Sequence, residues 1–115
     1  MSYFSLIAAT PILPREEDLQ ALTAQCPYEL DWWQIGGAFH GKLTDDDGIG
    51  HNQLLKAHCD DSSLTAFAFA KPGHYVEKGA VSFGSPVNAD WPAVFLQEIE
   101  AVPRSWFLTV IHCHF

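Results

Sequence analysis

Positive charge is scarce in this sequence. Six Lys and Arg residues stand against fourteen Asp and Glu residues, which gives a formal net charge of -8 at pH 7. The cations are spread singly, so the sequence lacks the basic patch with interleaved aromatic residues that nucleic-acid binding needs, and the acidic field repels phosphate backbones and anionic lipids. The sequence therefore predicts no direct contact with nucleic acid and favours a partner protein with a basic surface.

Long apolar runs and paired cysteines are also lacking. No window approaches the roughly 18 apolar residues of a membrane span, and the first residues carry no basic flank of a signal peptide. Cys26, Cys59 and Cys113 are odd in number and widely spaced, which fits neither a disulfide framework nor a metal knuckle. We therefore expect a cytoplasmic protein without membrane contact, whose three cysteines are buried free thiols.

Apolar and aromatic residues are abundant enough for the chain to fold. Hydrophobic residues make up 48% and aromatic residues 13% of the 115 residues, far from the balance that keeps a chain disordered. A chain of this length buries about two thirds of the surface that its unfolded form exposes. We expect residues 1–115 to form a single α+β domain.

The first half of the chain predicts a strand, a helix and a second strand. The apolar run 3–9 is a strand that ends before Pro11. A helix over about 14–25 follows, because acidic residues at 16–18 suit the positive end of its dipole. The bulky segment 30–43 predicts a bent strand, in which Gly36 and Gly37 mark a bulge or a close backbone approach.

The second half predicts a hairpin, a helix and a strand. Alternating small and aromatic residues at 65–71, a Pro-Gly turn and a returning strand over 74–84 give the hairpin. A helix then runs from an N-cap at Asp90 to about Ala101. The segment 105–115 is apolar on both faces for most of its length, which is typical of a central strand.

This order of elements favours a ferredoxin-like sandwich, in which two helices cover one face of a mainly antiparallel sheet. The other face then needs a cover for an aromatic row formed by Phe67 and Phe69, or by Phe107 and Ile111. A partner protein or a homodimer would supply that cover.

Three blocks of the sequence occur in a familiar order: DWWQIGGAFHG, AFAKPGHYVEKG and SWFLTVIHCHF. They resemble a family of small proteins of bacteriophages and their hosts, whose members carry motifs like DWYxIGGRW, FVTPDGxWHEKG and TLLTVVDCHI. The chain departs from that pattern in having Ala38 and Phe39 in place of arginine and an aromatic residue, and His112 in place of aspartate. The resemblance implies a phage setting, and thus the cytoplasm of a host cell.

Several residues invite a catalytic or metal-binding interpretation. His112 and His114 fall on one side of a strand, as zinc ligands can, but no spacing selects a further ligand among His40, His51, His58 and Cys59. Asp45, Asp47 and Gly48 resemble the start of a calcium loop, yet no glutamate closes it. His74, Ser82, Ser85 and Cys59 sit in no recognised nucleophile motif. We therefore expect no enzyme activity, no cofactor and no bound metal.

The leading hypothesis is an acidic inhibitor that binds a basic, nucleic-acid-binding surface of a host protein or complex, such as an anti-CRISPR or other anti-defence protein. One of two alternating tryptophans should face the core and the other the open side of the sheet. The alternatives are an immunity protein that neutralises a toxin, a metalloenzyme using His112 and His114, and a virion or scaffold component. The predicted partner-binding residues are Trp32, Trp33, Asp45, Asp46, Asp47, Asp60 and Asp61.

Overall fold

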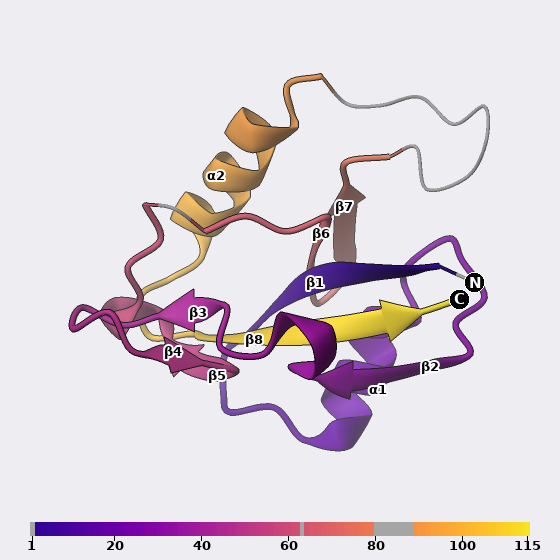
Figure 1. The fold of residues 1–115 in the computed structure, drawn as a ribbon, viewed down its shortest axis with the longest axis horizontal. Helices are drawn as coiled ribbons and strands as arrows, with labels where there is room; N and C mark the ends of the chain where they lie inside the picture. The colour runs from indigo at the N-terminus through magenta and orange to yellow at the C-terminus, as the bar shows by residue number, and fades with distance from the viewer. Residues whose placement is uncertain (1, 63, 80–88) are drawn as a thin grey trace.

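The computed structural model describes residues 2–62, 64–79 and 89–115 and is built around a mixed, mostly antiparallel sheet (Figure 1). The strands of this sheet run in the order β2-β8-β1-β6-β7, with β5 also paired to β8. Their bounds are β1 Tyr3–Thr10, β2 Trp32–Ile35, β5 Gln53–Leu55, β6 Ala68–Lys71, β7 His74–Glu77 and β8 Phe107–His114. The predicted α+β class and mainly antiparallel sheet are confirmed.

The smaller elements fill the loops around this sheet. A separate two-stranded sheet pairs β3 (Leu43–Thr44) with β4 (Gly50–His51). The short 3-10 helices are η1 (Gly37–Phe39) and η2 (Lys56–His58). Neither of the two α-helices seen in the described part of the chain, α1 (Glu16–Thr23) and α2 (Trp91–Ala101), is long and apolar enough to cross a membrane.

The last strand, β8, lies in the interior of the sheet, as its two apolar faces predict. It pairs with β1 along its whole length, from Tyr3 opposite His114 to Thr10 opposite Phe107. On its other side β2 pairs with its C-terminal half and β5 with its N-terminal half. Its residues are buried from Leu108 to the end of the strand, because strands pair with both of its edges and side chains pack on both of its faces.

The two helices lie on opposite faces of the sheet, so the predicted placement of both on one face is wrong (Figure 1). Ile7 of β1 packs with Phe95 of α2, whereas Leu6 packs with Leu19 of α1. Successive side chains of a strand point to opposite faces, and β1 is apolar at nearly every position. Both faces of the sheet centre therefore need a cover, which a ferredoxin-like sandwich with one helical layer would not provide.

The predicted aromatic row on β6 does not form. Phe69 is fully buried in the cluster under α2, but Phe67 packs with the cluster under α1. The alternation breaks because β6 begins at Ala68 and the Phe67 amide donates to Ser5 Oγ at 3.1 Å. Ile111 is also buried under α1. The chain itself covers these side chains, which removes the reason for a homodimer through that row.

Other predicted bounds hold in part. The hairpin forms with its turn at Pro72 and Gly73, although residues 80–84 of its second arm lie outside the described residues. The helix predicted at 14–25 is shorter, at Glu16–Thr23, and α2 ends at Ala101 as expected. The strand predicted over 30–43 is confined to Trp32–Ile35, because Gly36 adopts a φ of 77° and turns the chain into η1.

Candidate protein-binding surface

Trp32 and Trp33 point to opposite faces of the sheet, as their alternation in a strand predicts. Trp33 packs against the core cluster under α1, and its indole N–H donates to Gln20 Oε1 at 2.8 Å. Trp32 points to the face that α2 covers and is 43% exposed. Trp32 is therefore the tryptophan that a partner can reach.

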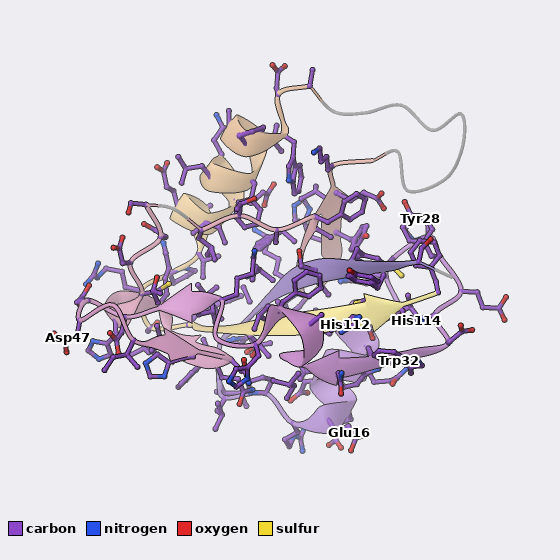
Figure 2. The ribbon with its side chains drawn as sticks, in the orientation of Figure 1. Glu16, Tyr28, Trp32, Asp47, His112 and His114 are labelled. Carbon is purple, nitrogen blue, oxygen red and sulfur yellow. The ribbon has the colours of Figure 1, made fainter. Side chains whose placement is uncertain are left out.

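Trp32 belongs to a group of rings that we call the aromatic–histidine surface: Tyr3, Trp32, Phe39, His112 and His114. Leu108 and Val110 of β8 lie in the cluster under α2. Every second side chain of a strand points to the same face, so His112 and His114 lie on that face too, beyond the residues that α2 packs on. Figure 2 shows Trp32 beside the two histidines near the end of β8. The surface occupies the part of this sheet face that α2 leaves uncovered.

His112 lies at the centre of this surface and is 8% exposed. The ring centroids of Trp32, Tyr3 and Phe39 lie 4.9, 5.1 and 5.4 Å from that of His112. Rings at these separations gain from tilted and edge contacts beyond the area they bury. The surface is therefore held in a fixed arrangement and is not a set of mobile side chains.

The imidazole of His112 is held in one protonation state. The Ala38 amide donates to its Nδ1 at 3.0 Å, so Nδ1 is an acceptor and the proton of the neutral ring lies on Nε2. Nε2 is buried and has no hydrogen-bond partner. Burial, and secondly the nearby His114, lower the pKa of His112 below its usual value. His112 is neutral at pH 7 and packs as an aromatic ring.

His114 links the surface to the start of β2. Its Nδ1 lies 3.2 Å from Asp31 Oδ2, a close contact without hydrogen-bond geometry. The Asp31 amide also donates to the carbonyl oxygen of His114 at 2.8 Å. Asp31 therefore places a carboxylate beside an imidazole at the edge of the surface.

Gly36 and Gly37 allow the chain after β2 to fold over this site. A Cβ on Gly37, which has a φ of 56°, would lie 2.5 Å from His112 Nδ1, and one on Gly36 would lie 2.8 Å from the Asn52 side chain. Neither distance is compatible with a side chain. The predicted close backbone approach at this glycine pair is confirmed, and it brings the Ala38 amide to His112.

The predicted acidic residues come together at a second place, which we call the acidic end: Asp45, Asp46, Asp47, Asp60 and Asp61. Asp45 forms a β-bridge with Cys59, and the Asp60 amide donates to the Thr44 carbonyl at 2.8 Å. Figure 2 shows Asp47 and Trp32 toward opposite ends of the longest axis. The predicted partner-binding residues therefore form two separate surfaces.

Asp45 is a carboxylate of the acidic end whose oxygens already have partners within the chain. Its Oδ1 accepts from the amides of Asp47 and Ile49, and its Oδ2 lies 2.7 Å from His51 Nε2. His51 first, and then these amides, lower the pKa of Asp45. Asp45 shapes the turn between β3 and β4, while Asp46, Asp47 and Asp60 remain exposed to a partner.

The histidines and cysteines do not assemble into a metal or nucleophile site in the part of the chain that the structure describes. No group of three or more His, Cys, Asp or Glu side chains is placed there to hold a metal. Burial first, and then Asp61 and its acidic neighbours, raise the pKa of Cys59 to about 11. Burial raises the pKa of Cys113 to about 12. Both cysteines are thiols at neutral pH and poor nucleophiles.

One polar cluster corresponds to no pattern in the sequence. Tyr28 and Tyr75 both donate their hydroxyls to the carboxylate of Glu77. Burial, followed by Glu77, raises the pKa of both tyrosines. The cluster ties the segment after α1 to β7 across 49 residues of sequence, a contact that no local pattern encodes. Tyr3 of the aromatic–histidine surface was predictable, because it lies an even number of residues from Ile7 on β1 and so faces the same side of the sheet.

Comparison with known proteins gives no relative for this chain. No family model matches it, and neither a curated protein nor a solved structure matches it with significance.

Proposed function

We propose that this protein acts by binding another protein, with the aromatic–histidine surface as its contact. One observation carries the proposal: Trp32 is 43% exposed and is held parallel to His114, with ring centroids 4.8 Å apart. Tryptophan is enriched among the residues that dominate interface energies. A ring that is already held in place loses less conformational entropy when a partner covers it.

The charge of the chain supports a cationic partner. The formal net charge is -8, and the exposed carboxylates of the acidic end add a local negative field. Such fields raise association rates with basic surfaces and repel nucleic acid and anionic membranes. The partner we propose is a host protein or complex with a basic, nucleic-acid-binding surface. The resemblance of three sequence blocks to phage proteins supports an inhibitor, such as an anti-CRISPR or other anti-defence protein.

Two alternatives receive less support. An immunity protein would use the same charge against a basic toxin, and a toxin gene beside the coding gene would favour it. A metalloenzyme would need His112 and His114 as ligands, but Nδ1 of His112 already accepts the Ala38 amide. Among the described residues, the two imidazoles belong to no group of three or more His, Cys, Asp or Glu side chains placed to hold a metal.

Affinity purification from the host tests the proposal. The wild-type protein should retain a specific partner at low salt and release it as salt rises, because the attraction is electrostatic. Trp32→Ala should lose the partner, whereas Ile12→Ala, which removes an exposed apolar side chain elsewhere, should keep it. A partner that binds both variants equally would refute the role of Trp32.

A further inference from the structure

The strand β2 has an edge without a partner strand in the described part of the chain. It lies at the end of the sheet order and pairs there with β8 alone. Ser2 and Phe115 exchange both backbone hydrogen bonds, so the backbone groups of Phe115 point toward β1. Along an antiparallel strand the backbone groups point to the two sides in turn, so those of His114 and His112 point toward β2. They lie there opposite Trp32 and Gln34. The Gly36 amide, which donates to Val110, fits the same alternation. The N–H and C=O groups of Trp33 and Ile35 therefore point away from the sheet.

A groove runs beside this free edge. Its volume is about 660 Å³, and it lies between α1 and the segment that leads into β2. Trp33 and Leu19 supply apolar surface there, and Ile35 is 40% exposed. We call this the edge groove. A strand added to β2 would direct alternate side chains into it, as in proteins that bind extended peptides beside a helix.

The charged residues that line the edge groove are all acidic. They are Glu16 on α1 and Asp31 before β2, and no Lys, Arg or His is among the lining residues. Arg15 turns instead to Glu17 and Asp18, at 3.0 and 3.5 Å. The Asp31 side chain is 62% exposed despite its contact with His114. A cationic side chain entering the groove would meet two carboxylates and no competing cation.

From the free edge, the groove and its charge we infer that β2 binds an extended cationic peptide segment of the partner protein by strand addition. This inference rests on the proposed function and names how the partner is held. The outward backbone groups of Trp33 and Ile35 pair with the segment, its apolar side chains cover Trp33 and Ile35, and a Lys or Arg faces Glu16 and Asp31. Strand addition takes affinity from the backbone and specificity from alternate side chains.

A second copy of this chain is a poorer occupant. Two β2 strands that paired antiparallel across a two-fold axis would bring the same surface of both chains together. Each edge groove would then meet the carboxylates of the other copy, and like charges placed opposite one another destabilise the pairing. A cationic segment turns the same carboxylates into attractive contacts.

Amide NMR spectra during titration with a synthetic peptide test the inference. The probe is an acetylated, amidated peptide in which Val and Lys residues are each separated by Thr, so that Val and Lys face the groove together, and the matched control carries Glu in place of Lys. The Lys peptide should shift the amides of Trp33 and Ile35 and protect them from hydrogen exchange, while the Glu peptide should not. Shifts confined to the acidic end, no shifts at millimolar peptide, or shifts that depend on protein concentration without peptide would each overturn the inference.

Two pairs of variants sharpen the test. Ile35→Pro removes an outward N–H and leaves the ladder to β8 intact, so it should abolish binding, whereas Ile35→Thr should retain it. Glu16→Gln should weaken binding about three- to tenfold, whereas Glu17→Gln, one residue along the same helix, should not. Equal effects within either pair would refute the inference.

The same variants separate this inference from the proposed function. A purified partner that depends on Trp32 but is indifferent to Ile35→Pro would contradict strand addition and leave the proposed function standing. Loss of the partner with Ile35→Pro and retention with Ile35→Thr would support both. No partner with the wild-type protein would count against the proposed function, while the peptide titration would still decide the groove.

Discussion

The indole ring of Trp32 lies parallel to the imidazole of His114, with 7° between their planes and 4.8 Å between their centroids. The two residues are directly opposite on β2 and β8. Cross-strand aromatic pairs of this type stabilise a sheet modestly, by up to about 1 kcal/mol. The pair therefore serves mainly to fix the orientation of a ring that water can reach.

The two tryptophans should differ in their effect on stability. We expect Trp33→Ala to lower the free energy of unfolding by about 3 kcal/mol, because it leaves a void against the core and an unpaired Gln20. Trp32→Ala should cost about 1 kcal/mol, the value of the ring stack. Urea unfolding of both variants measures this difference. A larger cost for Trp32 would mean that its role is structural.

Substitution of Gly37 should be far more damaging than substitution of another glycine with positive φ. Gly37→Ala should lower the free energy of unfolding by about 3 kcal/mol, because its Cβ would displace His112 in addition to straining the backbone. A Cβ on Gly73 would have no other atom within 4 Å, so Gly73→Ala should cost only about 1 kcal/mol, from backbone strain. Thermal unfolding of the two variants compares them directly. Equal losses would contradict the close contact.

Stability should fall as the pH drops through the ordinary range of histidine. The pKa of His112 is lowered in the folded protein from a usual value of 6.5, so the unfolded chain binds the proton first and protonation favours unfolding. The folded state keeps its full stability when the pH is above the usual pKa of histidine, and it loses stability as the pH falls below that value. The free energy of unfolding in urea should be lower at about pH 5.5 than at about pH 7.5.

Two variants assign this pH dependence to His112. His112→Asn keeps an acceptor for the Ala38 amide and does not titrate, so its free energy of unfolding should change less over the same range. His58→Asn, which replaces an exposed histidine, should retain the wild-type profile. An unchanged profile in His112→Asn would show that another group is responsible.

Lys56 should stabilise the C-terminal end of α2. Its ammonium group donates to the carbonyl oxygens of Val102 at 2.7 Å and Glu100 at 3.2 Å, where α2 has no basic residue of its own. We expect Lys56→Met to lower the free energy of unfolding by about 1 to 2 kcal/mol, because the carbonyls at the negative end of the dipole lose their donor. Chemical denaturation checks this value, and Lys78→Met on the exposed surface should change it by less than about 0.5 kcal/mol.

The sequence predicted local structure well because its strongest signals are local. The proline after Thr10, the acidic first turn of α1 and the two apolar faces of β8 each describe one segment, and each prediction was confirmed. The placement of the helices was not predictable from the same signals. It depends on which face of β1 each helix covers, and β1 is apolar on both.

The candidate site was predicted in its parts but not in its arrangement. The alternation of side chains along a strand indicated that one of the two tryptophans would be exposed. It could not show that the exposed ring belongs to Trp32, because that depends on the pairing of Trp32 with His114. The acidic residues gather at the acidic end, apart from Trp32 (Figure 2). Contacts such as Tyr28 with Glu77 join distant segments, and such contacts arise only once the sheet has formed.

The position of β8 has a consequence for how the molecule is made. β8 is the latest of the described elements along the chain, yet β1, β2 and β5 all take their hydrogen bonds from it. During synthesis these three strands must wait with unsatisfied edges until the ribosome has released residues 107–114. A nascent chain stalled before Phe107 therefore presents unpaired, aggregation-prone strand edges to chaperones.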